Sequence, residues 1–316
     1  MRLSRRLMRL DINSQARSTL VAVAALVVLL AACSGPGRGT SPATTASASA
    51  LKVVTTTTVF ADIVQNVGGD RVVATSIIPP GVGPEDYEPK PGDAQLLSEA
   101  RLIVSNGVGL DDFLDKLLQS GAGGTTPRLV LGDGIPTIDI DGQPNPHFWL
   151  DPSLVKQYYV PKISAKLTEL DPAGTATFSA NASVYARKLD SLDAELAGMV
   201  AQIPPQNRKL VTFHDAFPYL ARHYGFELIG VILPNVGQEP SASELAALVE
   251  KVKAAGVKAV FSEAQFSPKL AQTLADETGI TKVVTTLYND ALGPPPADTY
   301  LGMMRYDMEQ IVQALQ

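Results

Sequence analysis

From Leu51 onward, short apolar runs rich in β-branched residues alternate with segments whose apolar residues recur every three or four positions. The short runs predict strands at residues 51–57, 72–78, 102–105, 128–131, 209–213, 227–233, 258–262 and 282–287. The other segments predict helices at residues 61–67, 94–100, 111–118, 216–224, 241–255, 267–278 and 299–315. Strands alternating with helices are typical of an α/β fold in which helices flank parallel sheets.

Residues 152–170 also have helical spacing, with Asp151 as the N-cap and a proline in the first position. Pro161 lies inside this segment. Because proline lacks the N–H that a helix interior requires, we expect a kink or a break there. Further along the chain, Ser241 and Glu244 have the spacing of a capping box at the start of a helix.

The segment 171–202 breaks the alternation, because its apolar residues form one long helical face. The residues of this face are Phe178, Tyr185, Leu189, Leu192, Leu196 and Val200. A helix of this length would extend over roughly 45 Å. It predicts two α/β lobes, residues 51–170 and 204–316, joined by a linking helix at residues 171–203. Ligands of open α/β sheets bind beyond the carboxyl ends of strands, so we expect a binding cleft between the lobes.

The N-terminal segment has the composition of an export signal. Residues 1–33 begin with a basic stretch, followed by an apolar run at 20–32 that is too short to remain a membrane span. The run ends in Leu-Ala-Ala before Cys33, the only cysteine of the chain, as in a bacterial lipoprotein signal. We expect a lipid on Cys33 to anchor the protein to the outer face of the cell membrane, or a periplasmic location. Residues 34–50 read as a flexible linker. An ordinary secretion signal followed by a chance or buried cysteine is the alternative.

Charge and cysteine content exclude several classes of protein. The chain has a formal net charge of −6, and because its first 32 residues hold five arginines and one aspartate, the remainder is more acidic than the whole. An acidic protein binds nucleic acid poorly and has no electrostatic attraction to anionic lipid. No cysteine follows Cys33, so the lobes have no internal disulfide.

Two of the three histidines lie in distinctive loops. His147 lies in the stretch Asn-Pro-His-Phe-Trp-Leu-Asp-Pro, and His214 directly follows a predicted strand. Neutral imidazole is the commonest protein ligand of transition metals, and a metal site needs about four ligands from distant parts of the chain. Two further loops, which hold Glu85 and Asp290, follow predicted strands in the same way. These four loops are where we look for the ligands.

Each candidate ligand has an ordinary structural alternative. His147 would then be a loop histidine bonded to a carbonyl group. His214 would cap the following helix, although Asp215 is the better N-cap candidate. Asp290 would be a turn former and Glu85 a solvated loop acid.

The chain resembles a known family in four places: the stretch around His147, the loop of His214, the Tyr-Glu-Pro turn at residues 87–89 and the long helix. The family is that of the metal-binding receptors of bacterial zinc and manganese ABC importers, and the resemblance extends over essentially all of residues 51–316. It implies two α/β lobes joined by a rigid helix, with one metal ion held between them. It also implies a monomeric receptor that hands the ion to a membrane permease.

The resemblance further implies the ligand set. His147, His214 and Asp290 match ligand positions of the family. Glu85 occupies the position where the family usually has a histidine, so it is the conditional fourth ligand. A site that uses Asp86 instead of Glu85, or one with three protein ligands, is the alternative.

Three further residues have supporting roles. Glu263 resembles an acid that recurs in the family, and we expect it to stand behind a ligand or to bridge the lobes rather than to bind the ion. Trp149 is expected in the wall of the pocket. His223 lies inside a predicted helix and is expected to be structural or exposed.

Imidazole and carboxylate ligands together suit Zn(II), Mn(II) and Fe(II), whereas lobes without cysteine disfavour Cu(I). In the family that the chain resembles, a histidine at the position of His214 accompanies zinc, and a glutamate there accompanies manganese. Glu85 points the other way, because two nitrogens and two oxygens are also the manganese-type ligand set. A site of this kind binds zinc more tightly by the Irving–Williams order. Zn(II) is therefore the predicted cargo, with Mn(II) next.

Two other functions fit the same chain less well. A metallohydrolase needs an open coordination position and a general base beside the bound water. The chain has no His-Glu-x-x-His motif and no Gly-x-Ser-x-Gly elbow. A surface adhesin would carry the same lipid anchor, but it leaves the four loops unexplained. We therefore expect a receptor and not an enzyme.

Overall fold

The computed structural model describes residues 50–84, 87–119, 121, 123–234 and 238–316. These residues form one compact unit. Cys33 with the predicted signal segment, nearly all of the predicted linker, Glu85 and Asp86 lie outside them. No helix within the described ranges is long and apolar enough to cross a membrane.

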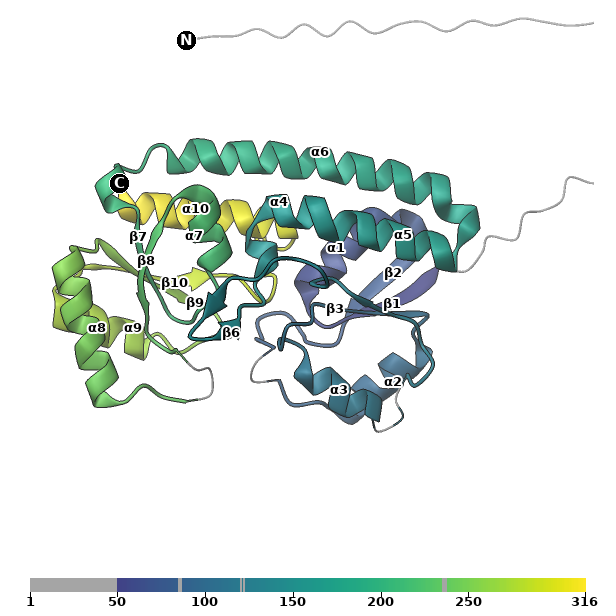
Figure 1. Cartoon of the computed structure of the whole chain (residues 1–316), viewed down its shortest axis with the longest axis horizontal. Coiled ribbons are helices and arrows are strands. Elements are labelled where there is room, and N and C mark those ends of the chain that lie inside the picture. Colours follow the sequence, from purple (N-terminus) through teal and green to yellow (C-terminus); the bar gives the residue numbers. More distant parts are fainter. Residues whose placement is uncertain (1–49, 85–86, 120, 122, 235–237) are drawn as a thin grey trace, which may run out of the picture. The chain divides into compact units, whose positions relative to one another are not determined.

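The first lobe is built on a four-stranded parallel sheet with the strand order β2-β1-β3-β4. Its strands are β1 (Leu51–Thr55), β2 (Val72–Ser76), β3 (Leu102–Ser105) and β4 (Arg128–Val130). Its first helices are α1 (Thr58–Gly68), α2 (Pro91–Glu99) and α3 (Asp112–Gln119). The predicted parallel sheet with flanking helices is confirmed (Figure 1).

Side chains alternate across β1 and β3, and this alternation decides which helices cover each face of the sheet. Val53 and Leu102 pack with the apolar residues of α1, whereas Val54 and Ile103 pack with those of α2 and α3. Parallel sheets are covered on both faces in this way. The loops at the carboxyl ends of the strands are then the segments that are available to form a site.

The segment 152–170 is helical but interrupted. It consists of α4 (Pro152–Leu154), a π-helical turn (Val155–Tyr159) and α5 (Val160–Leu170). Asp151 is the N-cap, because its Oδ1 accepts the Ser153 N–H at 2.9 Å. Pro161 is the second residue of α5, one residue beyond the π-helical turn. Proline has no N–H to donate to the preceding turn, which explains why the predicted break occurs there.

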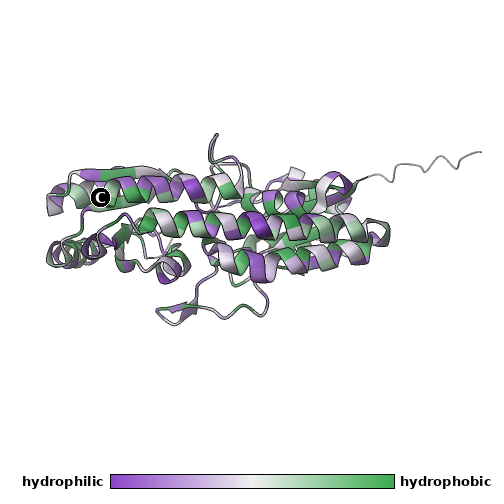
Figure 2. Cartoon of the chain, turned by 90° about the horizontal axis from the view of Figure 1, so that it is seen from above, coloured by the Kyte–Doolittle hydropathy of each residue, from purple (hydrophilic) through white to green (hydrophobic). Residues whose placement is uncertain are grey.

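The longest described helix is α6 (Thr175–Val200), whose 26 residues span about 39 Å. It begins later than predicted, because Pro172–Gly174 form a 3₁₀ turn. Before this turn, Asp171 accepts a hydrogen bond from Arg71 at 2.7 Å. The helix packs against α1 and α5 of the first lobe and against α10 (Tyr300–Leu315) of the second. Seen from above in Figure 2, apolar and polar positions alternate in patches along these helices.

The second lobe contains two parallel strand pairs, β7 with β8 and β9 with β10, and β7 lies beside β9. Its strands are β7 (Lys209–Thr212), β8 (Glu227–Val231), β9 (Ala259–Glu263) and β10 (Lys282–Leu287). Its other helices are α7 (Pro218–Tyr224), α8 (Ala242–Ala255) and α9 (Lys269–Thr278). The predicted strand–helix alternation is confirmed here as well.

A short hairpin that is absent from the predicted elements precedes His147. Its strands, β5 (Asp139–Ile140) and β6 (Gln143–Pro144), are antiparallel. Between them, Asp141 and Gly142 have φ angles of 50° and 81°. Two-residue hairpin turns with positive φ at both positions favour Asp-Gly. This dipeptide is the sequence signal for the hairpin.

The start of α8 offers a test of local capping. Ser241 Oγ accepts the Glu244 N–H at 3.2 Å, and Glu244 Oε2 accepts the Ser241 N–H at 2.8 Å. Ser241→Ala removes the hydroxyl, so we expect the free energy of unfolding, measured with urea, to fall by about 1 kcal/mol. Ser191→Ala in α6, where the exposed hydroxyl bonds only Arg187 O, is the control and should change it by less than about 0.5 kcal/mol. Equal losses would contradict the capping role.

Candidate metal centre

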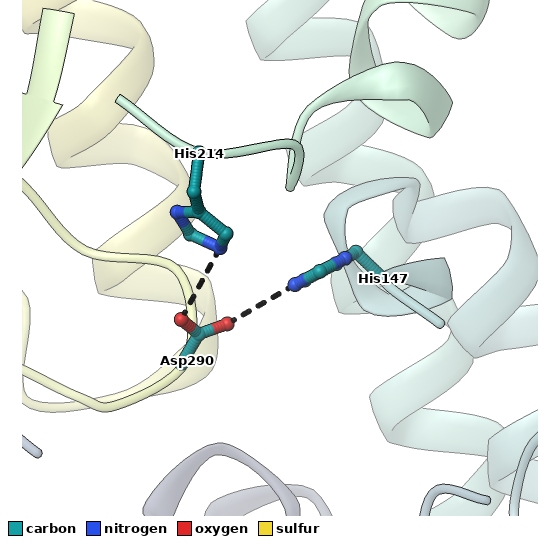
Figure 3. A group of neighbouring side chains, drawn as sticks. All are labelled: His147, His214 and Asp290. Atoms are coloured by element: carbon teal, nitrogen blue, oxygen red, sulfur yellow. Dashed lines mark ion pairs between the residues drawn. The ribbon is translucent and has the colours of Figure 1, made fainter. Parts of the chain in front are cut away.

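Three of the predicted ligands meet at one buried place. His147 precedes the 3₁₀ turn Phe148–Leu150 of the first lobe. In the second lobe, His214 follows the end of β7 and Asp290 lies in the loop after β10. These residues are 4%, 2% and 0% exposed. Asp290 Oδ1 lies 3.5 Å from His147 Nε2, and Asp290 Oδ2 lies 3.6 Å from His214 Nε2 (Figure 3).

The spacing of these atoms suits a small cation. One ligand atom from each residue lies within 4.8 Å of the other two. Ligands at 2.0–2.2 Å around a tetrahedral ion are about 3.4 Å apart, close to the two nitrogen–oxygen distances. Two imidazoles and a carboxylate are donors that Zn(II), Fe(II) and Mn(II) accept. Glu85 and Asp86 lie outside the described residues, so the fourth ligand stays a prediction.

Glu263, at the end of β9, orients the ring of His214. Its Oε1 lies 3.1 Å from His214 Nδ1, and the residue is fully buried. A carboxylate partner keeps the proton on Nδ1 and turns the Nε2 lone pair toward the site. Burial raises the pKa of the Glu263 carboxyl, and His214 opposes this rise. The structure thus places Glu263 behind His214.

Asn145 orients the ring of His147. Its Oδ1 lies 3.1 Å from His147 Nδ1 and accepts the backbone N–H of the same histidine at 3.1 Å. Its Nδ2 donates to Asp215 O of the second lobe at 2.6 Å, which fixes the orientation of the amide. The proton therefore lies on His147 Nδ1, and Nε2 faces Asp290. Asn145 is missing from the predicted site, and its only sequence signal is its place in the His147 stretch.

Two amide side chains hold Asp290. Asn289 Oδ1 accepts the Asp290 backbone N–H at 2.8 Å. Gln265 Nε2 donates to Asp290 Oδ2 at 2.8 Å and to Asn289 Oδ1 at 3.0 Å. Asn289 Nδ2 lies 3.2 Å from His214 Nε2, in agreement with a lone pair on that nitrogen. Neither amide belongs to the predicted site, and nothing in the local pattern of the sequence marks them.

Trp149 links the two lobes beside the site. Its Nε1–H donates to Asn289 O at 2.6 Å, and its ring centroid lies 5.1 Å from that of His147. Its backbone oxygen accepts the hydroxyl of Tyr300, the first residue of α10, at 2.6 Å. The aromatic ring therefore fixes the His147 turn against both the Asp290 loop and α10.

A cavity of about 760 Å³ opens onto His147 and His214. Pro84 and Tyr87, which flank the two undescribed acids of the first loop, are among its lining residues. The cavity offers a cation a route to the two imidazoles.

Asp215 also lines this cavity, and it does not cap the helix that follows. The helix begins at Pro218 with Phe217 as its N-cap residue and no side-chain cap. The prediction of Asp215 as N-cap is therefore wrong, because the chain makes a further turn before the helix begins. Burial raises the pKa of the Asp215 carboxyl, while His147 and His214 oppose the rise.

The third histidine lies away from this centre. His223 Nε2 lies 2.7 Å from Asp193 Oδ1, and its Nδ1 lies 3.4 Å from Asp151 Oδ1. His223 thus joins α7 to α6 and to the N-cap of α4.

The comparison with known families identifies the chain. Residues 53–314 match the family described as zinc-uptake complex component A, periplasmic. The chain belongs to this family. The resemblance seen in the motifs is confirmed, and with it the class of protein: a substrate-binding component of a metal ABC importer that works outside the cytoplasm.

Individual relatives differ in the metal that they are named for. The manganese-binding lipoprotein MntA of Halalkalibacterium halodurans is 31% identical over 296 residues, which cover 92% of this chain and 95% of that protein. The iron-binding protein YfeA of Yersinia pestis is 35% identical over 276 residues, covering 84% and 87%. The solved structure of the periplasmic zinc-binding protein TroA of Treponema pallidum is 30% identical with a TM-score of 0.77, and covers 84% of this chain and 99% of that chain.

The loop before the first-lobe histidine depends on a buried network. Asn106 Nδ2 donates to Pro146 O at 2.9 Å, and the Tyr159 hydroxyl donates to Asn106 Oδ1. The neighbouring Gly107, with a φ of 80°, donates its N–H to Asp111 Oδ2 at 2.6 Å. Asp111 therefore fixes a left-handed turn that glycine tolerates.

The pH dependence of the free energy of unfolding tests the protonation state of Asp111. Burial raises the pKa of its carboxyl from 3.8 to about 6. The folded protein therefore keeps a proton that the unfolded chain releases, and this stabilisation is complete below about pH 4 and lost as the pH rises through about 6. Asp111→Asn stays neutral. The free energy of unfolding of this variant, minus that of the unaltered protein, should therefore increase between pH 4 and pH 7.5 by at most about 3 kcal/mol. A difference independent of pH would contradict this.

Proposed function

We propose that this chain captures Zn(II) outside the cytoplasm and delivers it to the permease of an ABC importer. The proposed ligands are His147, His214 and Asp290, with Glu85 as the fourth. The observation that carries the proposal is the convergence, at one buried place, of two imidazoles and a carboxylate that come from both lobes. The proposed activity is binding and release, not catalysis.

The hydrogen bonds behind the imidazoles support a metal site. His147 Nδ1 and His214 Nδ1 each lie 3.1 Å from a side-chain oxygen, of Asn145 and Glu263 respectively. Metal-ligating histidines almost always have such a partner at their second ring nitrogen. Nitrogen-rich ligation and a nitrogen–oxygen spacing near that of a tetrahedron favour Zn(II) over ions that prefer oxygen ligands.

Glu85 is the proposed fourth ligand because it occupies the position where the family usually has a histidine. It directly follows Pro84 in the first loop. Pro84 and Tyr87, on either side of the two acids, line the cavity onto which the imidazoles open. Carboxylate oxygens bind Zn(II) at 2.0–2.2 Å, a distance close to that of imidazole nitrogens. Asp86 in place of Glu85, or a site with three protein ligands, is the alternative.

The second candidate cargo is Mn(II), together with Fe(II). The relatives MntA and YfeA are named for manganese and iron. A second carboxylate from Glu85 would also make the centre more favourable to these ions, because carboxylates suit Mn(II). Competition between the ions therefore decides the cargo.

The division of the chain that we propose from the sequence pattern is consistent with this function. The segments are a lipoprotein signal at residues 1–33, a linker at 34–50, lobes at 51–170 and 204–316, and a linking helix at 171–203. A lipid on Cys33 would keep the receptor, as a monomer, at the membrane surface. The linker would connect this lipid to the lobes.

Substitution of each histidine tests the ligand assignment. We expect His147→Ala and His214→Ala to weaken zinc binding by more than about 100-fold, since even the partners of ligands contribute 10–100-fold. His223→Ala, which removes the contacts with Asp193, Asp151 and Tyr224, should leave the affinity within about threefold. The affinities are measured by competition with a chromogenic chelator. Equal losses for all three variants would refute the assignment.

Competition between the two metals tests the cargo and the fourth ligand. The metal-stripped protein is dialysed against equal Zn(II) and Mn(II), and bound metal is counted by mass spectrometry. We expect one zinc per chain, with less retained by Glu85→Ala because one of about four ligands is lost. Zinc retention that Glu85→Ala leaves unchanged would exclude Glu85. Preferential retention of manganese would reverse the choice of metal, and no bound metal would refute the receptor function.

A further inference from the structure

Gln265 bonds the carboxylate of a proposed ligand, Asp290. Its Nε2 donates to Asp290 Oδ2 at 2.8 Å and to Asn289 Oδ1 at 3.0 Å. The orientation of this amide is fixed. Asn289 Oδ1 must be the oxygen, because it also accepts the Asp290 backbone N–H at 2.8 Å, so Gln265 presents its NH₂ group to two oxygens.

The turn that carries Gln265 directly follows β9, whose last residue is Glu263. The Phe266 N–H donates to Glu263 O at 3.1 Å and closes the turn. One short segment therefore supports two proposed ligands, because Glu263 bonds His214 and Gln265 bonds Asp290. This arrangement makes Gln265 a positioning residue, since it acts on the ion only through Asp290.

The hydrogen bond distinguishes the two oxygens of Asp290. Oδ2 accepts the Gln265 amide and lies 3.6 Å from His214 Nε2, whereas Oδ1 lies 3.5 Å from His147 Nε2 (Figure 3). The hydrogen bond of 2.8 Å from Gln265 occupies one lone pair of Oδ2. It also lowers the electron density that Oδ2 offers to an ion. Oδ2 is then a weaker second ligand for an ion that Oδ1 already binds.

Ions differ in how much they need that second oxygen. Zn(II) is satisfied by four ligands in a tetrahedron. Larger, harder cations such as Ca(II) take six to eight oxygens and use carboxylates with both oxygens, and Mn(II) shares the preference for six-coordinate oxygen sites. A carboxylate limited to one oxygen therefore costs the larger ions more than it costs Zn(II).

We propose that Gln265 restricts Asp290 to one metal-ligating oxygen and so biases the centre toward four-coordinate Zn(II) against Mn(II). This inference rests on the proposed function and deepens it, because it names the residue that sets metal preference at the same site. The preference comes from a hydrogen bond to a ligand and not from the identity of the ligands.

The test compares three variants of the metal-stripped full chain. Gln265→Met keeps the length of the side chain and removes the donor. Gln265→Leu also removes the donor and adds neither a charge nor a metal ligand. Gln272→Met is the matched control, because Gln272 makes the same bond, from Nε2 to Asp276 Oδ1 at 2.8 Å, on the exposed face of α9.

Two quantities are measured for each variant: the ratio of the zinc and manganese dissociation constants, and the visible absorption of bound Co(II). Four-coordinate Co(II) absorbs far more strongly than five- or six-coordinate Co(II), so the spectrum reports the number of ligands. We expect both Gln265 variants to lower the preference for zinc by about tenfold or more, with a weaker Co(II) absorption. Gln272→Met should change neither quantity.

The outcomes separate this inference from the proposed function. An unchanged zinc-to-manganese ratio, or equal weakening of both metals with an unchanged Co(II) spectrum, would overturn the role of Gln265 while leaving zinc capture intact. An unaltered protein that binds no metal would refute the proposed function itself. An unaltered protein that prefers manganese would refute both zinc capture and the proposed bias. Thermal unfolding of each variant checks that a change in binding is not a loss of fold.

Discussion

The rest of the structure depends on holding two imidazoles and a carboxylate together at one buried place. Buried polar groups are costly unless they are hydrogen-bonded. Here each ring has an oxygen at Nδ1, from Asn145 for His147 and from Glu263 for His214. Those partners are themselves held, since Asn145 also donates to the second lobe. The polar network is therefore continuous across the boundary between the lobes.

The scaffold supports this network from both lobes. The long helix α6 packs against helices of both lobes, and Trp149 bonds Asn289 while accepting a bond from Tyr300. These contacts fix the loops that carry the proposed ligands. Binding by a pre-organised site avoids the cost of ordering flexible loops, so more of the ligation energy is expressed as affinity.

Family membership defines the class of cargo but not the ion. Relatives of similar identity are named for manganese, iron and zinc, although they share one fold. The divalent ions of the first transition row accept the same donor atoms, so selectivity must come from geometry and from how firmly each donor is held. In this chain the carboxylate of Asp290 is bonded by Gln265, and such outer contacts tune a site whose ligand types are common to several metals.

The sequence by itself determined the features that depend on residues close together in the chain. These are the strand–helix alternation, the long helix, the break at Pro161 and the cap at Ser241. It also placed His214, Asp290 and Glu85 in loops after predicted strands, because hydrophobic period and strand polarity are local properties. Only the tertiary structure brought in Asn145 and Gln265 and excluded Asp215 as a helix cap. An amide side chain carries no charge or periodic pattern, and its role depends on partners from distant segments. The fold alone decides which of these partners it meets.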